Sequence, residues 1–258
     1  DGHTIFHQPG NGFTVQIGAG SAIAAETGIP VVCDFRTGDV ALGGQGAPLV
    51  PIGDRLLFSE FDACLNLGGF ANISYEWNDQ RIAFDICPAN IILNRLVATL
   101  GLEYDKDGMI ARAGQTDHQL LQKLNALSFY GQPFPKSLGR EWMEQVFLPV
   151  INEGDINVYD LMRTAYDHIA YQVNNSLQFN KNCKILVTGG GAHNKFLLEL
   201  IRSHGNHQWI TPSKELADFK EALVFAFLGV LRWNGRVNIL GSVTGSKIDH
   251  SGGVICIP

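Results

Sequence analysis

One acidic residue lies where a predicted strand gives way to a predicted helix. Asp85 follows the apolar run 81–84 and precedes Pro88 and a helical pattern that starts at Asn90. A carboxylate in this position can cap the helix. It can also act as a general base if a cleft partly buries it, because burial raises its pKa and keeps it basic enough to take a proton. From this segment alone, the helix cap is the simpler interpretation.

Two short glycine segments could bring a ligand close to the backbone. Gly18 and Gly20 follow a predicted strand and open a short helix, and Asp34 lies near the end of the next strand, as in a dinucleotide fingerprint. Ile23 stands where that fingerprint needs Gly or Ala, so a plain helix-entry turn is favoured. The double glycine at 68–69 lies between two predicted strands and either exposes N–H groups as an anion nest or turns a hairpin. On this motif alone the hairpin is favoured.

The strongest signal for a ligand is the triple glycine at 189–191. It follows the buried-type strand 184–188 and opens a helix. Three glycines cost conformational entropy that an ordinary loop avoids, and a helix N-terminus suits a phosphate, so a ligand is favoured over a flexible connection. Farther along, Glu221 heads the apolar helix 222–231. An acid there either complements the helix dipole or accepts hydrogen bonds from a ribose.

Composition excludes several classes of partner. Lys and Arg total 19 against 25 Asp and Glu, a formal charge of −6 that argues against nucleic acid and anionic membranes. The longest apolar stretch is far short of the ~20 residues that span a bilayer. The five cysteines are scattered without a Cys-x-x-Cys pair, which is typical of reduced thiols in the cytoplasm. The eight histidines show no ligand spacing, so no protein-held transition metal is expected.

The elements that must position these residues alternate between strands and helices, which predicts an α/β fold. Residues 36–51 are too rich in glycine for a regular element and are predicted to form a structured loop. The runs 63–67, 72–77 and 81–84 predict an antiparallel meander. Further strands are predicted at 13–17, 31–33, 184–188 and 253–257, and helices at 21–27, from 90 onward, and at 117–127, 157–179, 194–203 and 215–233.

Seven motifs taken together resemble one family over essentially the whole chain. The motifs are DFRTGDVALGGQGAPLVP (34–51), NLGGFANIS (66–74), FDICPAN (84–90), YDKDG (104–108), PKSLGRE (135–141), VTGGGAHN (187–194) and KEALVFAFLG (220–229). Their order and content resemble the anhydro-N-acetylmuramic acid kinases. The resemblance implies the two-lobe actin-like, sugar-kinase (ribonuclease H-like) fold. In that fold residues 1–33 and the returning strand 248–258 would be a remnant of lobe one, and residues 34–247 would form lobe two.

The resemblance also implies an activity and a set of site residues. These enzymes use ATP, with Mg²⁺ held mainly through the nucleotide phosphates, and water to open 1,6-anhydro-N-acetylmuramic acid and phosphorylate its O6. The matching positions are Asp85 for the catalytic base, Arg36, Asp39 and Asn90 for the sugar, and Gly68, Gly69, Asn72, Gly189, Gly190, Gly191 and Glu221 for the nucleotide. No role follows for residues 135–141, and a homodimer stays open.

The chain departs from the family pattern in two ways. Around the base the family has Asp-Thr-Gly-Pro-Gly-Asn, whereas this chain has Ile86, Cys87 and Ala89 in place of the Thr and two Gly. The hydroxyl is lost and two Cβ atoms tighten the loop. The first phosphate loop, of Gly-Thr-Ser-Leu-Asp-Gly type, is missing, so we expect a fragment that is inactive alone. The alternative functions are a non-catalytic actin-like nucleotide-binding module and, third, a nicotinamide-dependent enzyme.

Overall fold

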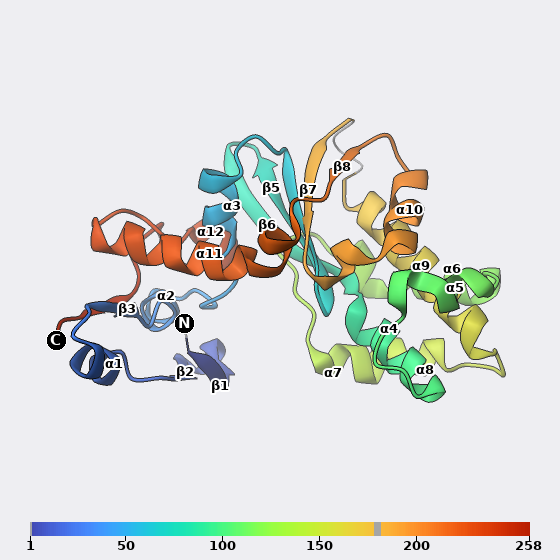
Figure 1. Cartoon of the computed structure of the whole chain (residues 1–258), viewed down its shortest axis with the longest axis horizontal. Coiled ribbons are helices and arrows are strands. Elements are labelled where there is room, and N and C mark those ends of the chain that lie inside the picture. The colour runs from blue at the N-terminus through green and yellow to red at the C-terminus, as the bar shows by residue number, and fades with distance from the viewer. Residues whose placement is uncertain (1, 178–181) are drawn as a thin grey trace. The chain divides into compact units, whose positions relative to one another are not determined.

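The computed structural model describes residues 2–177 and 182–258, and the chain forms two compact units (Figure 1). Unit 1 comprises Asp1–Glu60, Tyr75–Ala83 and Phe219–Pro258, and unit 2 comprises Phe61–Ser74 and Phe84–Asp218. These boundaries differ from the predicted lobe boundaries at 33/34 and 247/248. The units are defined by packing alone, so the assignment of lobes stays a prediction.

A sheet of five strands in the order β6-β5-β4-β7-β8 forms the framework of unit 2, although residues 75–77 of β5 and 80–83 of β6 are assigned to unit 1. Its strands are β4 (Ala63–Leu67), β5 (Phe70–Trp77), β6 (Gln80–Pro88), β7 (Lys184–Thr188) and β8 (Gln208–Ile210). The pairs β4–β7 and β7–β8 are parallel. Connections of two residues join β4 to β5 and β5 to β6, and such short connections join only antiparallel strands. The predicted meander is therefore confirmed, and the mixed sheet with its helices confirms the α/β class.

The helices of unit 2 surround a buried central helix, α9 (Val158–Asn175), whose Ala165, Ile169 and Val173 are 0% exposed. The others are α4 (Asn90–Val97), α5 (Met109–Ala113), α6 (His118–Asn125), α7 (Arg140–Trp142), α8 (Leu148–Ile151) and α10 (Lys195–Ser203). A π-helical turn, Met143–Phe147, joins α7 to α8. The predicted end of the 157–179 helix lies outside the described residues.

Three helices of unit 2 begin where a side chain accepts a hydrogen bond from the first turn. Asp117 accepts from Leu120 N, Asn157 from Asp160 N and Asn194 from Leu197 N. These acceptors satisfy N–H groups that the helix itself leaves unpaired, which fixes the starts of α6, α9 and α10. The sequence placed each start within one residue.

Unit 1 contains two small antiparallel sheets. One is the hairpin of β1 (His3–Gln8) and β2 (Phe13–Ile17), and the other pairs β3 (Val31–Cys33) with β9 (Val254–Cys256). Its helices are α1 (Gly20–Thr27), α2 (Thr37–Ala41), α3 (Pro51–Leu57), the part of α11 (Lys214–Trp233) from residue 219 on, and α12 (Gly241–Thr244). The prediction of a structured loop without regular elements over 36–51 is wrong at α2, whose buried Val40 anchors a short helical turn.

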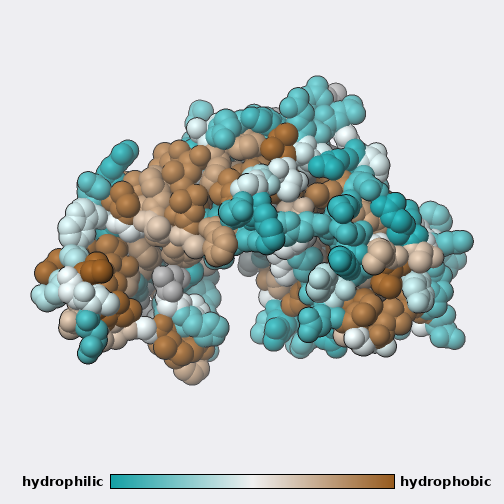
Figure 2. All heavy atoms as spheres, viewed as in Figure 1, coloured by the Kyte–Doolittle hydropathy of each residue, from teal (hydrophilic) through white to brown (hydrophobic). Residues whose placement is uncertain are grey.

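The core of unit 1 forms where α3 packs on α11. A Cβ on Gly53 would lie 2.5 Å from the Cγ atoms of Val224, so only glycine permits this approach. Val224 and Leu228 are both 0% exposed. Other apolar side chains of the unit are exposed, among them Phe6 of β1 and Phe219 of α11. Figure 2 shows hydrophobic residues at the surface over α11 and over the β1–β2 hairpin. Within the described residues, a helix with the length and apolar character to cross a membrane is absent.

Candidate active site

Two glycine-rich loops lie at the same edge of the sheet in unit 2. The parallel strands β4 and β7 are in register with Asn66 opposite Thr188. Residues 68–69 follow β4 directly, and residues 189–191 follow β7. Ligands of α/β proteins bind outside the carboxyl ends of parallel strands. The two loops predicted to bind the nucleotide therefore share the edge at which such a ligand binds.

Packing explains two of the three glycines after β7. Gly189 has φ +83°, and a Cβ there would lie 2.5 Å from Asn66 Oδ1 and 2.9 Å from the Leu67 carbonyl carbon. A Cβ on Gly191 would lie 2.7 Å from Leu67 Cβ. Gly190, by contrast, is exposed, and the nearest atom to its Cβ position is an Asn90 nitrogen at 3.6 Å. The close approach of the loop to β4 thus requires glycine at 189 and 191, while 190 is the position open to a ligand.

The double glycine after β4 is a turn bonded to the start of α4. The Gly68 carbonyl accepts from Asn90 N at 3.1 Å, and the Gly69 carbonyl accepts from Ala89 N at 2.8 Å and Ile91 N at 3.1 Å. The Asn90 side chain donates through Nδ2 to the Leu67 carbonyl at 2.9 Å. Asn90, predicted to contact the sugar, therefore joins α4 to the end of β4 and lies beside the triple-glycine loop. Asn72, the remaining predicted nucleotide residue of this unit, is half-buried in β5.

Asp85 is held by a segment distant in sequence. The Leu138 backbone N–H donates to Asp85 Oδ2 at 2.8 Å, and the Asp85 backbone N–H donates to the Lys136 carbonyl at 3.0 Å. The carboxylate is half-buried. Burial raises the pKa of Asp85, and the hydrogen bond from Leu138 partly offsets this by favouring the charged form.

The helix-cap alternative for Asp85 is wrong. The N-cap residue of α4 is Ala89, and no side-chain hydrogen bond caps that helix in the described structure. Asp85 lies four residues earlier, within β6, and its carboxylate bonds to Leu138. Its position is therefore that of a carboxylate oriented by a neighbouring segment, with a raised pKa, which suits a general base.

The residues that depart from the family pattern point into unit 2. Ile86 is 3% exposed, and Cys87 and Ala89 are both 0% exposed. Burial and the nearby charge of Asp85 raise the pKa of the Cys87 thiol, which stays protonated. These three side chains therefore belong to the packed interior next to Asp85.

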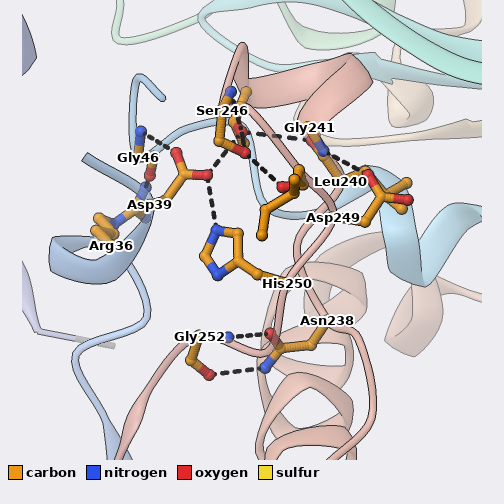
Figure 3. Close-up of polar contacts among 12 residues, drawn as sticks. Arg36, Asp39, Gly46, Asn238, Leu240, Gly241, Ser246, Asp249, His250 and Gly252 are labelled. Atoms are coloured by element: carbon orange, nitrogen blue, oxygen red, sulfur yellow. Dashed lines mark hydrogen bonds and ion pairs between the residues drawn. The ribbon is translucent and has the colours of Figure 1, made fainter. Parts of the chain in front are cut away.

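In unit 1 the Asp39 carboxylate is fully buried and holds the loop that follows α2. Its Oδ2 accepts from Gly46 N at 2.7 Å, and its Oδ1 accepts from Thr244 Oγ1 at 2.7 Å and hydrogen-bonds with His250 Nε2 at 3.1 Å (Figure 3). The side chain is 0% exposed, and a Cβ on Gly44 would lie 2.2 Å from it. Asp39 is thus bonded inside unit 1, where it fixes residues 43–46.

Arg36 and Glu221, both predicted site residues, interact electrostatically in unit 1. Arg36 Nη1 donates to the Gly46 carbonyl at 2.8 Å, and its guanidinium lies 5.8 Å from the centre of the Phe225 ring. Burial lowers the pKa of Arg36, and the carboxylate of Glu221 counteracts this. Glu221 is exposed in the second turn of α11. The expectation that it heads a helix is wrong, because α11 begins at Lys214.

The structure adds residues that the sequence did not single out. Thr244 and His250, which bond to Asp39, lie in a polar tail with no recognisable pattern. Asp105 lies in the YDKDG motif, for which the sequence predicts no role. Its buried carboxylate accepts from Ile110 N at 2.9 Å and from the Tyr166 hydroxyl at 3.1 Å.

The YDKDG motif braces the helix that follows the triple glycine. The Asn194 side chain caps α10 and donates to the Tyr166 hydroxyl at 2.6 Å, and this hydroxyl donates in turn to Asp105. A Cβ on Gly108, at φ +73°, would lie 2.5 Å from Phe196 Cβ. The motif therefore fixes the helix end next to residues 189–191.

The fold and the site define an α/β protein with two glycine loops at the carboxyl edge of its sheet and an oriented carboxylate on the outer strand β6 of the same sheet. The family model for anhydro-N-acetylmuramic acid kinase matches residues 1–258, and the chain belongs to that family. This confirms the resemblance in the sequence and supports the predicted sugar-kinase type of fold.

Individual relatives agree with the family model. An anhydro-N-acetylmuramic acid kinase of Aliivibrio fischeri is 37% identical over 98% of this chain and 73% of its own length. One of Methylobacterium nodulans is 37% identical over 100% of this chain and 70% of its own length. Among solved structures, the activator of the 2-hydroxyisocaproyl-CoA dehydratase from Clostridium difficile with bound ADPNP aligns with a TM-score of 0.44 at 15% identity, covering 72% of this chain and 66% of that chain.

Proposed function

We propose that the protein to which this chain belongs opens 1,6-anhydro-N-acetylmuramic acid with water and ATP, giving N-acetylmuramic acid 6-phosphate and ADP. Family membership supports the choice of substrate. The observation that carries the chemistry is the half-buried Asp85 carboxylate with one oxygen held by a backbone N–H. The proposal includes a cytoplasmic site of action, consistent with the five free cysteines.

Asp85 acts as the general base in this proposal. Among the described residues, its Oδ1 has no hydrogen-bond partner, so this oxygen can accept a proton from water. The water oxygen bonds to the anomeric carbon as the bond from that carbon to O6 breaks. O6 then takes the γ-phosphoryl group, and the bond from that phosphorus to the β-phosphate oxygen breaks to release ADP. The burial that raises the Asp85 pKa makes the carboxylate a stronger base.

The nucleotide is proposed to bind against the backbone of glycines, which carry no side chain. Gly190 is exposed and open, and Gly189 and Gly191 allow its loop to approach the end of β4. The turn after β4 contains Gly68 and Gly69, and the following strand β5 contains Asn72. We propose that the carboxylate of Glu221 binds the ribose. Bound Mg-ATP supplies the phosphoryl group and the charge that neutralises the transferring phosphate. The described residues contain no cluster of three or more His, Cys, Asp or Glu for a metal, so we propose that phosphates hold the Mg²⁺.

The sugar side is proposed to involve Arg36, Asp39 and Asn90. Arg36 provides a positive charge for polar groups of the sugar. Asp39 acts through Gly46, whose N–H it holds, because its carboxylate is fully buried. Asn90 acts through the end of β4, to which its side chain donates. The buried Asp39 and the half-buried Asn90 are therefore proposed to shape the sugar site through the backbone they hold.

The test is release of ADP that depends on the anhydro sugar, measured with the complete gene product and with the 258-residue chain. Replacing Asp85 with Asn removes the base while keeping the shape, and we expect turnover to fall about 10²- to 10⁴-fold. Asp79→Asn is the matched control, because Asp79 is exposed in the β5–β6 turn at φ +63°, a conformation that Asn accepts readily. We expect this variant to keep full turnover.

Two results would contradict the proposal. Turnover by Asp85→Asn at the normal rate would show that Asp85 is not the base. Binding of ATP by the complete protein, with no turnover on the anhydro sugar, would instead indicate a non-catalytic nucleotide-binding module. We expect the 258-residue chain to lack turnover by itself, and sugar-dependent ADP release by this chain would refute that expectation.

A further inference from the structure

Residues 136–138 of the PKSLGRE motif run along the outer strand of the sheet. β6 is the last strand in the order, so its outer edge has no strand partner among the described residues. The segment bonds to that edge at Asp85, through the Lys136 carbonyl to the backbone and through the Leu138 N–H to the carboxylate. Lys136 thus holds the backbone of Asp85, and Leu138, two residues farther along the same segment, holds its side chain.

The Lys136 side chain fixes this segment to unit 2. Its Nζ donates to the Phe129 carbonyl at 3.1 Å and to the Tyr130 carbonyl at 3.4 Å. The same atom lies 4.7 Å from the centre of the Phe129 ring and 6.0 Å from that of Phe84. Burial lowers the pKa of Lys136, while the carbonyls and ring faces provide favourable contacts for its positive charge.

Aromatic packing makes the surroundings of Lys136 rigid. Phe134 stacks on Phe84, the residue before Asp85, with ring centres 5.6 Å apart and planes 12° apart. Trp142 packs on Phe129 at 5.3 Å, and the Tyr130 hydroxyl is hydrogen-bonded to His168 Nε2 at 2.8 Å. Since His168 is 0% exposed in the central helix α9, the segment is attached to the core of unit 2.

We propose that residues 136–138 are the positioning element of the base, with Lys136 anchoring the segment and the Leu138 N–H holding Asp85 Oδ2. This inference rests on the proposed role of Asp85. Fixing Oδ2 prevents rotation of the carboxylate, so Oδ1 is the oxygen that faces the water. A general base placed in this way loses rate when its support is loosened, even though it is still present.

The hydrogen bond has a second consequence, for the protonation of the base. The Leu138 N–H favours charged Asp85 and so lowers its pKa, against the raising effect of burial. In the part of the chain that the structure describes, the other titratable group that interacts with the carboxylate is the Cys87 thiol on its own strand, with Tyr130 beside Cys87. Lys136 contacts Asp85 through its backbone carbonyl. Loss of the bond would move the Asp85 pKa upward, so the base would be protonated over a wider range of pH.

The first test uses the amide of Leu138 in the unmodified chain. The proton chemical shift of this amide is followed by NMR as pH is varied, together with the carboxyl carbon shift of Asp85. We expect the two signals to titrate with one midpoint, and the amide titration to disappear in Asp85→Asn. If the Leu138 amide shift does not change as Asp85 titrates, the inference is wrong. This result would not depend on any substitution in residues 136–138.

The second test loosens the segment by Lys136→Met, which keeps the side-chain stem and removes the donor. We expect the Asp85 midpoint to move to higher pH and kcat of the complete protein to fall about tenfold or more, with KM for ATP unchanged. Lys136→Arg keeps a donor and should restore both. Lys123→Met is the control, because Lys123 is exposed and bonds only to Glu153 in the described structure.

The outcomes separate this inference from the proposed function. If folded Lys136→Met keeps the normal Asp85 midpoint and kcat while Asp85→Asn is inactive, the positioning role is wrong and the base stands. If Asp85→Asn retains turnover, the proposed function is wrong, whatever the amide of Leu138 shows.

Discussion

Single alanine substitutions in the triple-glycine loop distinguish packing from ligand binding. The three positions are adjacent, yet their surroundings differ sharply. A Cβ at 189 or 191 would meet atoms of Asn66 or Leu67 at 2.5–2.7 Å, whereas at 190 the nearest atom is 3.6 Å away. The same chemical change therefore has three different expected costs within one turn of chain.

The cost at each position follows from its geometry. Gly189 has φ +83° and ψ +169°, a region that only glycine occupies readily, so alanine costs on the order of 1–3 kcal/mol before any contact is counted. Its Cβ would also meet the Leu67 backbone at 2.9 Å, which cannot move as a side chain can. At Gly191 the contact with Leu67 Cβ costs about 1–3 kcal/mol. At Gly190 we expect a change within about 0.5 kcal/mol.

The assay is amide hydrogen exchange of β7, which reports on unit 2 alone. Exchange of residues 185–188 should accelerate about tenfold or more in Gly191→Ala, further in Gly189→Ala, and little in Gly190→Ala, since about 1.4 kcal/mol corresponds to tenfold. For Gly190→Ala we expect the opposite result, in which ATP binds more weakly and the stability of unit 2 is unchanged. Equal destabilisation by all three substitutions, or normal ATP binding by Gly190→Ala, would refute this reasoning.

Two further predictions concern buried polar groups. Asp39→Ala should destabilise unit 1 by about 3–5 kcal/mol, because it leaves Gly46 N, Thr244 and His250 without their acceptor, as measured by urea unfolding and by faster exchange of the Gly46 amide. Asp249→Ala is its control, because Asp249 is exposed and, within residues 2–177 and 182–258, accepts a hydrogen bond from Gly241 N alone. A cost as large as that of Asp39→Ala would contradict the argument. Burial lowers the pKa of His168 to about 3, below its ordinary 6.5. As pH falls, the unfolded chain therefore takes up a proton on His168 before the folded chain does. The stability that His168 contributes should be complete above pH 6.5 and decline toward pH 3, and the decline should be smaller in His168→Gln. Identical pH dependence of unfolding in the two proteins would show that His168 is not responsible.

Elements with a complete local signal could be predicted from the sequence. Strand β7 is a short apolar run bounded by glycine, and α10 begins at an Asn that caps it, so both were placed correctly. Strand β1 gave no signal because all its residues are exposed, and apolar alternation depends on one buried face. Helix α2 was missed because Gly38 and the following glycines argue for a loop, whereas tertiary burial of Val40 decides the local structure.

The candidate site shows the same division between local and distant information. The type and position of Asp85 were sufficient to propose a base, but its partner Leu138 is 53 residues away and the bond uses a backbone N–H, which side-chain identity does not reveal. The polar tail that bonds to Asp39 is separated from it by about 200 residues of sequence, at Thr244 and His250. A pattern of residue types cannot contain such pairs, because the fold alone brings them together.

Several residues conspicuous in the sequence hold backbone segments that we propose to be part of the site. Asp39 fixes Gly46, and Asn90 fixes the end of β4. Asp105 supports, through the Tyr166 hydroxyl, the cap of the helix after the triple glycine. Polar side chains buried in this way are expensive unless fully bonded, so each must be matched by a particular backbone geometry. By the same argument, we expect the buried side chains of Ile86, Cys87 and Ala89 to act on the proposed base, Asp85, through its placement.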